Sequence, residues 1–287
     1  MDYDIFCNVL NKHLFEGQKE KLLKNLADHP ERFLGLFHPT KPHAKLLQNL
    51  LQSQEIKFGD ALEEIIRLII ADMNFTNLPL SITDDNHESL SLDQYFTDGN
   101  RYFFIEQKIR DDHDSTKKRG QIQNFHRKLS LLKKTHDNLT GIMYFIDSDL
   151  EKNKNYYEHE LVVMNKQMGV EVLQFYGKEL FVFFNNIEAW DNLIEWLNLW
   201  KSDLPDFPEL NFDLSPNDSF NEIKNLGGRY WEKIISNDIF WQEGIIKVLF
   251  KTGETLELLK KYYWDINSPH SKRMASLLST RIEKLYQ

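Results

Sequence analysis

The segment SLDQYFTDGNRYFFIEQK, residues 91–108, decides the fold of this chain. Asp98-Gly99 at its centre is a residue pair preferred in two-residue β-hairpin loops. Apolar and polar residues alternate on both sides of the pair, which is typical of two antiparallel strands. The segment therefore predicts a β-hairpin whose second strand ends in Glu106 and Lys108.

A two-residue loop would fix the register of this hairpin. It places Thr97 opposite Asn100, Phe96 opposite Arg101 and Asp93 opposite Phe104. Opposed residues share a face and successive residues alternate between faces. Asp93, Glu106 and Lys108 are therefore predicted to project from one side, with Asp93 diagonal to Glu106. The other face is predicted to carry the apolar residues that hold the register, namely Leu90, Leu92, Phe96, Phe103 and Ile105.

Two carboxylates and an ammonium group on one face suggest metal-assisted chemistry. Two nearby anions repel each other unless a cation lies between them. Ligands that are all oxygen suit Mg²⁺, which retains water molecules for reaction. Lys108 could then orient or deprotonate a water for attack on a phosphodiester. The alternative is a partly exposed hairpin with an ordinary Glu–Lys surface pair.

The acidic-x-Lys tripeptide decides nothing by itself, because it occurs three times. Glu55-Ile56-Lys57 precedes a predicted helix, and Glu222-Ile223-Lys224 lies within a helical pattern. Only Glu106-Gln107-Lys108 ends a predicted strand that a hairpin precedes. The context of the third copy therefore favours a functional site there.

The hairpin between two predicted helices carries Asp93, then twelve intervening residues, and then Glu106-Gln107-Lys108. This pattern resembles the motif of the PD-(D/E)xK nuclease superfamily. Within it, the chain is most similar to type II restriction endonucleases, over about residues 55–185. Leu92 stands where the motif has proline, and Gln107 is polar where an apolar residue is usual. The resemblance implies that Asp93 and Glu106 hold Mg²⁺ and that Lys108 serves the attacking water.

The resemblance also implies a further glutamate on the helix before the hairpin. KFGDALEEI, residues 57–65, points to Glu63, with Glu64 as the neighbouring candidate. Glu63 would assist through the hydration shell of the metal. The implied activity is sequence-specific hydrolysis of double-stranded DNA by a homodimer, paired functionally with a DNA methyltransferase. Two other interpretations stay open, a structure-selective repair or recombination nuclease and a catalytically silent DNA-binding or interaction module.

The segment after the hairpin is strongly basic. Residues 101–134 contain ten Lys and Arg and four acidic residues, a net +6 in a chain of net charge −9. Phosphates respond to the local field more than to total charge, so this segment is predicted to contact DNA. The candidates for contacts with phosphates or base edges are Arg110, Lys117, Lys118, Arg119 and Gln121. The alternative is a solvated helix face, as most charged runs are.

The elements around the hairpin predict a mixed central sheet flanked by helices. Apolar periodicity predicts helices after Gly59, at 119–136 and at 157–168, and strands at 141–146 and 170–175. The order α-β-β-α-β-α-β predicts an α/β fold, and the resemblance implies a restriction-endonuclease-like core. The predicted divisions are a helical N-terminal extension (1–56), a catalytic core (57–201) and a mainly helical C-terminal subdomain (202–287).

Composition limits the class of protein. The chain of 287 residues has 41% hydrophobic and 28% charged residues, which is ordinary for globular domains. Cys7 is its only cysteine, which excludes an internal disulfide and fits a reducing compartment. No apolar run approaches the roughly 20 residues needed to span a bilayer. Because the first residues are acidic rather than basic, we expect no signal peptide and a cytoplasmic protein.

Overall fold

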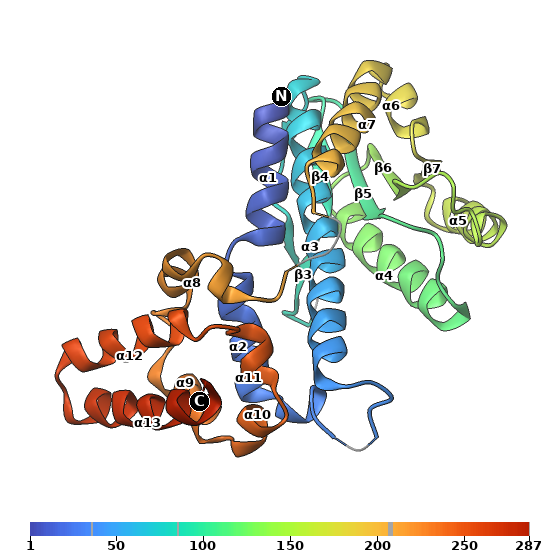
Figure 1. The fold of residues 1–287 in the computed structure, drawn as a ribbon. Helices are drawn as coiled ribbons and strands as arrows, with labels where there is room; N and C mark the ends of the chain where they lie inside the picture. Colours follow the sequence, from blue (N-terminus) through green and yellow to red (C-terminus); the bar gives the residue numbers. More distant parts are fainter. Residues whose placement is uncertain (36, 85, 206–208, 287) are drawn as a thin grey trace. The chain divides into compact units, whose positions relative to one another are not determined.

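The structure is a computed structural model that describes residues 1–35, 37–84, 86–205 and 209–286 (Figure 1). The chain divides into two units. The first unit contains Met1–His13 and Lys57–Leu204, and the second contains Leu14–Ile56 and Pro205–Gln287. The core predicted at 57–201 thus lies within the first unit, and the N-terminal 56 residues are shared between the two units.

A five-stranded mixed sheet forms the centre of the first unit, in the order β1-β4-β5-β6-β7. The strands are β1 (Thr76–Asn77), β4 (Gln94–Thr97), β5 (Tyr102–Lys108), β6 (Leu139–Phe145) and β7 (Glu171–Tyr176). Strand β4 is antiparallel to β1 and β5, whereas β5, β6 and β7 are parallel. A separate antiparallel ribbon consists of β2 (Ser81–Thr83) and β3 (Ser89–Ser91). The predicted α/β class with a mixed central sheet is confirmed.

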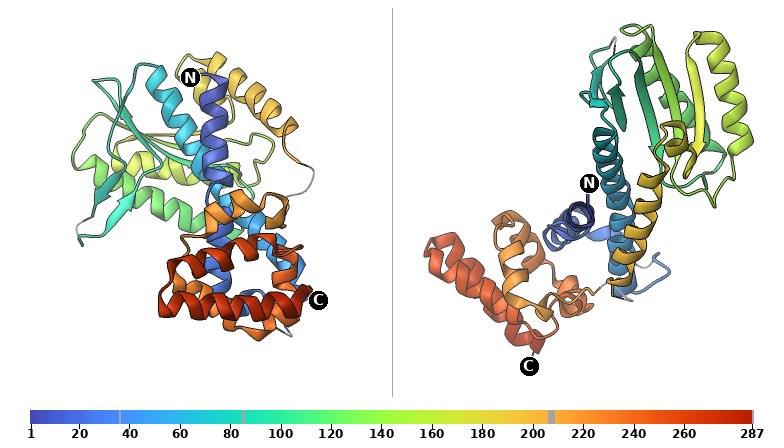
Figure 2. Two further views of the ribbon diagram at one scale, coloured as in Figure 1. Left: turned by 60° about the vertical axis from the view of Figure 1, so that its left-hand side comes forward. Right: turned by 90° about the horizontal axis from the view of Figure 1, so that it is seen from above.

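Helices cover both faces of this sheet (Figure 2). The helices of the unit are α1 (Tyr3–Phe15), the C-terminal part of α3 (Pro42–Asp72), α4 (Ser115–Lys133), α5 (Lys154–Met168), α6 (Glu179–Phe183) and α7 (Ile187–Ser202). On one face, Phe104 packs in a cluster with Phe125 of α4 and Tyr157 of α5. On the other face, Phe103 stacks on Phe96, beneath the rings of residues 75 and 184. Because both faces are covered, every residue of β6 is buried, as expected for a central parallel strand.

Gly141 of β6 sets the distance between the sheet and α4. A Cβ atom at this position would lie 2.8 Å from Leu129 Cδ1 and 3.1 Å from Phe125 Cζ. Both neighbours are fully buried, so they have little room to yield. Glycine therefore allows α4 to lie close to the strands that carry the predicted site.

The hairpin turn is longer than its sequence predicts. Strands β4 and β5 pair Gln94 with Ile105 and Thr97 with Tyr102, so four residues rather than two connect them. The predicted pairing is wrong by two residues because the Asp98 carboxylate closes a wider loop. Its Oδ1 accepts hydrogen bonds from the backbone N–H groups of residues 100 and 101, at 2.8 and 2.7 Å. A shift of two residues leaves each side chain of β4 and β5 on its predicted face.

Leu90 and Leu92 do not share the face of Phe96, contrary to the prediction. Leu90 lies in the separate β2–β3 ribbon, and Leu92 packs with Tyr95 and Phe104 beneath α4. The prediction failed because it continued one strand through residues 92 and 93, where the chain leaves β3 and enters β4. The helix predicted to begin after Gly59 is also longer, since α3 runs through this glycine from Pro42.

The second unit is helical. It contains the N-terminal part of α3 together with α2 (Gln18–Asp28), α8 (Pro216–Ile223), α9 (Gly228–Ser236), α10 (Asp238–Gln242), α11 (Ile245–Leu249), α12 (Glu254–Ile266) and α13 (Pro269–Tyr286). Trp231, Ile234 and Ile235 of α9 and Trp241 of α10 are buried in its core. Across the described residues of both units, no helix is long and apolar enough to cross a membrane.

Candidate active site

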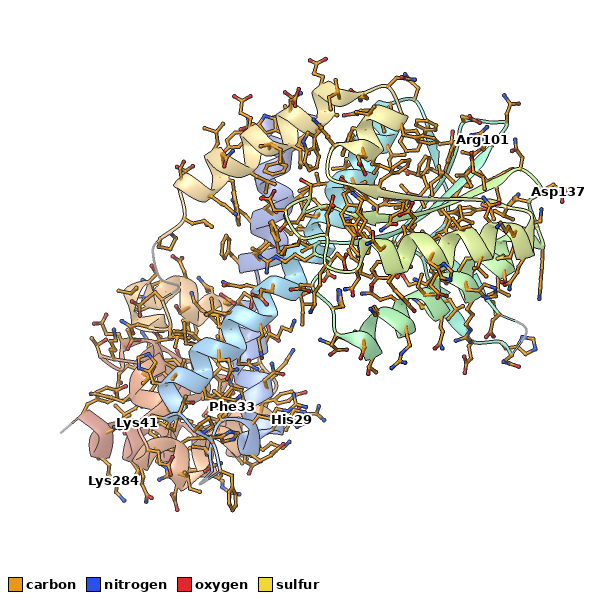
Figure 3. All side chains as sticks on the ribbon, turned by 90° about the vertical axis from the view of Figure 1, so that its right-hand side faces the viewer. His29, Phe33, Lys41, Arg101, Asp137 and Lys284 are labelled. Carbon is orange, nitrogen blue, oxygen red and sulfur yellow. The ribbon has the colours of Figure 1, made fainter. Side chains whose placement is uncertain are left out.

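The acidic residues predicted to act together meet where β5 ends and β4 begins. Asp93 directly precedes β4, and its Oδ2 accepts a hydrogen bond of 2.8 Å from the backbone N–H of Gln107. The observed register places Asp93 beside Glu106 rather than diagonal to it. This end of β5 is opposite to the one marked by Arg101 and Asp137 in Figure 3, where β5 and β6 begin. Asp93, Glu106 and Lys108 therefore lie together at the C-terminal end of a parallel strand.

Three oxygen atoms surround the ammonium group of Lys108. Its Nζ lies 3.0 Å from Asp93 Oδ2 and 3.0 Å from Glu106 Oε1. It also donates a hydrogen bond of 2.7 Å to the carbonyl oxygen of Gln107. Two carboxylates and one carbonyl thus converge on a single cation.

A second lysine, Lys128 of α4, completes the cluster. Its Nζ lies 2.6 Å from Glu106 Oε2 and 3.9 Å from Asp93 Oδ1. The other oxygen of Glu106 also accepts a long hydrogen bond of 3.4 Å from Asn124 of α4. The two carboxylates are therefore balanced by two ammonium groups, one from β5 and one from α4.

Sequence reasoning missed Lys128, although a signal for it exists. Lys128 occupies a position that helical spacing assigns to the buried stripe of α4, which contains Ile122, Phe125, Leu129 and Leu132. A lysine is seldom buried without a partner of opposite charge. A charged residue within an apolar stripe therefore indicates an acidic partner on the facing strand, although not which one.

Glu63 of α3 is the predicted third acidic residue, and the structure places it near the same cluster. Burial raises its pKa to about 7, and the nearby charge of Asp93 adds to this effect. The carbonyl oxygen of Glu63 accepts a hydrogen bond of 2.7 Å from Gln94 at the start of β4. Its neighbour Glu64 instead contacts His13, at 2.7 Å. Of the two candidates, Glu63 is the one that contacts the hairpin, through its backbone carbonyl.

The charges of the cluster perturb each other. Burial raises the pKa of Asp93, and repulsion from Glu106 raises it further, against the opposing effect of the two lysines. Burial alone would lower the pKa of Lys108, but the carboxylates of Glu106 and Asp93 outweigh it and keep the pKa above its ordinary value. Lys108 is therefore an ammonium ion at neutral pH in this arrangement.

The predicted DNA-binding residues lie on the connection from β5 to α4 and in the first turns of α4. This helix begins at Ser115, earlier than predicted, because Asp114 caps it by accepting bonds from the N–H groups of residues 116 and 117. Lys117 and Arg119 are exposed. Lys118 lies over the Tyr156 ring, with Nζ 4.4 Å from its centre. Arg110 is exposed and lies 3.8 Å from the carboxylate of residue 147.

Gln121, the fifth DNA-binding candidate, is bonded within the chain at both ends. Its Oε1 accepts a bond of 2.6 Å from Tyr157, and its Nε2 lies 3.0 Å from Nε2 of His113. Asp111, in the same connection, is fully buried and accepts bonds from Asn153 and Tyr176. These contacts fix the path of the segment that follows Lys108.

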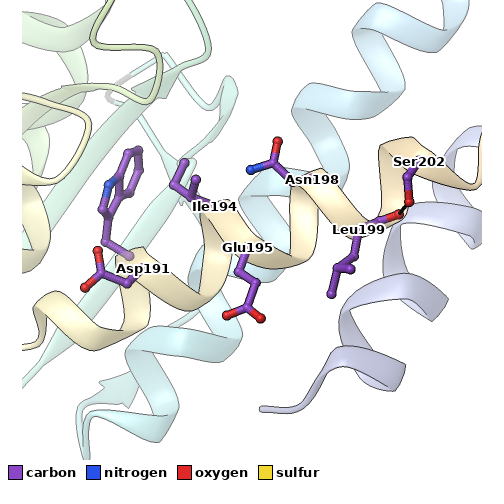
Figure 4. Close-up of a pocket in the computed structure, with 7 residues that line it drawn as sticks. Asp191, Ile194, Glu195, Asn198, Leu199 and Ser202 are labelled. Atoms are coloured by element: carbon purple, nitrogen blue, oxygen red, sulfur yellow. Dashed lines mark hydrogen bonds between the residues drawn. The ribbon is translucent and has the colours of Figure 1, made fainter.

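A surface hollow of the first unit lies elsewhere, on α7 (Figure 4). It measures about 590 Å³, and its lining residues, from Trp190 to Ser202, all belong to this one helix. None of the residues predicted for catalysis lines it. The acidic cluster at the end of β5 therefore remains the candidate active site.

The comparisons with known proteins identify the family of this chain. The family model of the type II restriction endonuclease HinfI matches residues 3–86 and 79–201, which include the whole cluster and α4. No curated protein and no solved structure shows a significant match. Since the family model matches well over half of the chain, the protein belongs to the HinfI family of type II restriction endonucleases.

Proposed function

We propose that this protein hydrolyses double-stranded DNA at a specific sequence with Mg²⁺, through a PD-(D/E)xK site formed by Asp93, Glu106 and Lys108. The observation that carries the proposal is the set of three oxygens around Lys108 Nζ, at 2.7 to 3.0 Å. Such an arrangement is unusual for a surface ion pair, because a backbone carbonyl shares the cation with two carboxylates. It is a ligand set suited to a small, hard cation.

The donor atoms fit Mg²⁺, which is commonly held by one or two carboxylates and keeps several waters. Among the described residues, no group of three or more His, Cys, Asp and Glu side chains is placed to hold a metal. The fit therefore rests on the carboxylates of Asp93 and Glu106 and the carbonyl of Gln107. When bound, Mg²⁺ would polarise the scissile phosphate and neutralise charge that develops on it.

Lys108 and Glu63 have distinct roles in this proposal. When Lys108 leaves the three oxygens, its ammonium can orient the attacking water by a hydrogen bond and stabilise the negative charge of the transition state. Glu63, with a pKa of about 7, can take up a proton from the water network near neutral pH. Asp93 and Glu106 remain in place as ligands.

Substrate contact is proposed for the connection after β5 and the start of α4. Arg110, Lys117, Lys118 and Arg119 would contact phosphates or base edges next to the site. Gln121 is left out, because base contacts would require it to break its bonds with Tyr157 and His113. For a symmetric DNA target we further propose a homodimer, and for protection of host DNA a partner methyltransferase, both by analogy with the family.

Digestion of a mixed-sequence plasmid tests the proposal. The wild-type protein in Mg²⁺ is expected to give discrete fragments. Asp93→Asn keeps the shape of the side chain and removes its charge, so it should abolish cleavage while the circular dichroism spectrum stays unchanged. Smearing, or cutting only at branched DNA, would indicate a repair nuclease instead. Intact plasmid after incubation with folded wild-type protein would contradict the proposed activity.

A further inference from the structure

We propose that Lys128 is a positioning residue of this site: its ammonium holds one oxygen of Glu106 and stays as a fixed counter-charge when Lys108 moves to serve the reaction. The inference rests on the proposed function, since it assigns Lys128 a role in the same site. Neither the tripeptide motif nor the hairpin contains this residue, which comes from α4.

Burial makes a partner for Glu106 necessary. Glu106 is 2% exposed and Lys128 is 5% exposed. A carboxylate removed from water to this extent is unfavourable unless it is paired and hydrogen-bonded. The separation of 2.6 Å between Lys128 Nζ and Glu106 Oε2 is that of a direct charge-assisted hydrogen bond.

The two lysines contact different oxygens of the Glu106 carboxylate. Lys108 contacts Oε1, whereas Lys128 contacts Oε2. A carboxylate held at Oε2 cannot rotate freely, so Oε1 stays directed at the point where the three oxygens converge. Lys128 thus fixes the orientation of Glu106, which together with Asp93 and Gln107 would hold the proposed metal.

The lysines differ in their freedom to move. The Lys108 side chain is 27% exposed, whereas that of Lys128 is 7% exposed. The stem of Lys128 leaves α4 between Phe125 and Leu129, both fully buried in the cluster beneath the sheet. Lys108 can therefore leave the carboxylates toward solvent, whereas Lys128 can leave only by disturbing packed side chains. Glu106 consequently keeps one cation throughout the reaction.

The test uses Lys128→Met, which keeps the stem and removes the charge, and Lys128→Arg, which keeps the charge. Lys166→Met in the last turn of α5, outside the basic segment, is the control. Single-turnover cleavage in Mg²⁺ by Lys128→Met should be roughly 10²-fold slower than wild type, with DNA affinity in Ca²⁺ changed by no more than about three-fold. Lys128→Arg should recover part of the rate. The control should cut at the wild-type rate.

A thermal double-mutant cycle measures the pair without DNA. Lys128→Met leaves Glu106 buried without its closest cation, so the Tm should fall by on the order of 10 °C. Combining it with Glu106→Gln removes the stranded charge, and the double variant should regain part of this Tm. A lysine that only fills space would show additive changes in Tm and parallel losses of binding and cutting.

The outcomes separate the two proposals. Cleavage by Lys128→Met at the wild-type rate, or additive Tm changes, in a protein whose wild type cuts DNA would overturn the role of Lys128. Absence of cutting by the wild type would overturn the proposed function and, with it, the positioning role. A coupled Tm cycle in that case would still support the ion pair of Lys128 with Glu106, so the cleavage assay and the cycle together would show which proposal had failed.

Discussion

The carboxylates at the end of β5 differ from those of surface ion pairs in their burial and in the number of their cationic partners. Asp93 and Glu106 are both largely buried, and each contacts two lysines. An exposed pair contributes little to stability, whereas a buried cluster is strongly destabilised when one partner is removed. Keeping four charged side chains in a buried place is costly for folding, which is consistent with the catalytic role that we propose for them.

The raised pKa of Glu63 can be tested through the pH dependence of stability. Its pKa of about 7 in the folded protein exceeds its ordinary value of 4.5. Stability from a carboxyl group whose pKa is raised by folding is complete below its unfolded pKa and is lost as pH rises through the folded value. The wild type should therefore lose stability between about pH 4.5 and 7, and Glu63→Gln should lose less.

Because Glu63 is partly solvated, the expected difference is modest, about 1–2 kcal/mol between pH 5 and 8. Denaturant unfolding of both proteins across this pH range measures it. Identical pH profiles for the wild type and Glu63→Gln would show that the carboxyl group of Glu63 is not strained by its surroundings.

The strand pattern of the hairpin predicted part of the site, whereas the pairing of its strands and the packing of α4 were not correctly predicted from the sequence. The alternation of residues 91–108 correctly placed Asp93, Glu106 and Lys108 on one face, because that result does not change when the register shifts by two residues. The exact pairing failed because the side chain of Asp98 bonds its own loop. Lys128 could not be assigned, because its distance from Glu106 depends on how closely α4 packs on β6.

Gly141 tests this dependence on packing. Gly141→Ala would place a methyl group 2.8 Å from Leu129 Cδ1. Because Leu129 and Phe125 are fully buried and have little room to yield, we expect α4 to shift away from the sheet. Overpacking of this kind costs about 1–3 kcal/mol. The displaced helix should also move Lys128 from Glu106, so we expect a lower Tm and slower single-turnover cleavage.

Gly120→Ala is the matched control for this variant. Gly120 lies on α4 itself, and a Cβ atom there meets no neighbouring atom within 4 Å outside its own helix turn. Alanine at an open helical position should raise stability by about 0.4–1 kcal/mol and leave cleavage unchanged. A Gly141→Ala protein as stable and as active as the wild type would contradict the close packing of α4.

We expect the basic residues in the first turns of α4 to contact DNA phosphates. Replacing Lys117, Lys118 and Arg119 by alanine should weaken DNA binding in Ca²⁺ and reduce the slope of log affinity against log salt concentration by up to about 3. The control replaces Lys166 and Lys201, in the last turns of α5 and α7, and should keep the slope. An unchanged slope in the triple variant would show that this turn is only a solvated surface.

The whole molecule has a net charge of −9, yet it belongs to a family that acts on DNA. The DNA contact that we propose for the basic segment after β5 would reconcile the negative net charge with DNA binding, since association depends on the field near the binding surface. The family match ends at residue 201, so it does not extend to α8–α13. Their role is therefore not inherited from the family model.

The proposed homodimer has a consequence that a plasmid assay can detect. Two sites acting in one complex should convert a supercoiled plasmid with one target directly to linear DNA. Light scattering should then give twice the chain mass of 34.2 kDa. Accumulation of nicked circles together with a monomeric mass would contradict the dimer and leave the catalytic site unaffected.

Single-turnover cleavage by Lys108→Met is the most direct test of the central claim that Asp93, Glu106 and Lys108 form a nuclease site. The variant keeps the side-chain stem and removes the charge that three oxygens surround. Lys224→Met, in the acidic-x-Lys copy within the second unit, is the control. With DNA affinity in Ca²⁺ within a few-fold of wild type, Lys108→Met should cleave roughly 10²-fold or more slowly in Mg²⁺, and Lys224→Met at the wild-type rate. Cleavage by Lys108→Met near the wild-type rate would contradict the account.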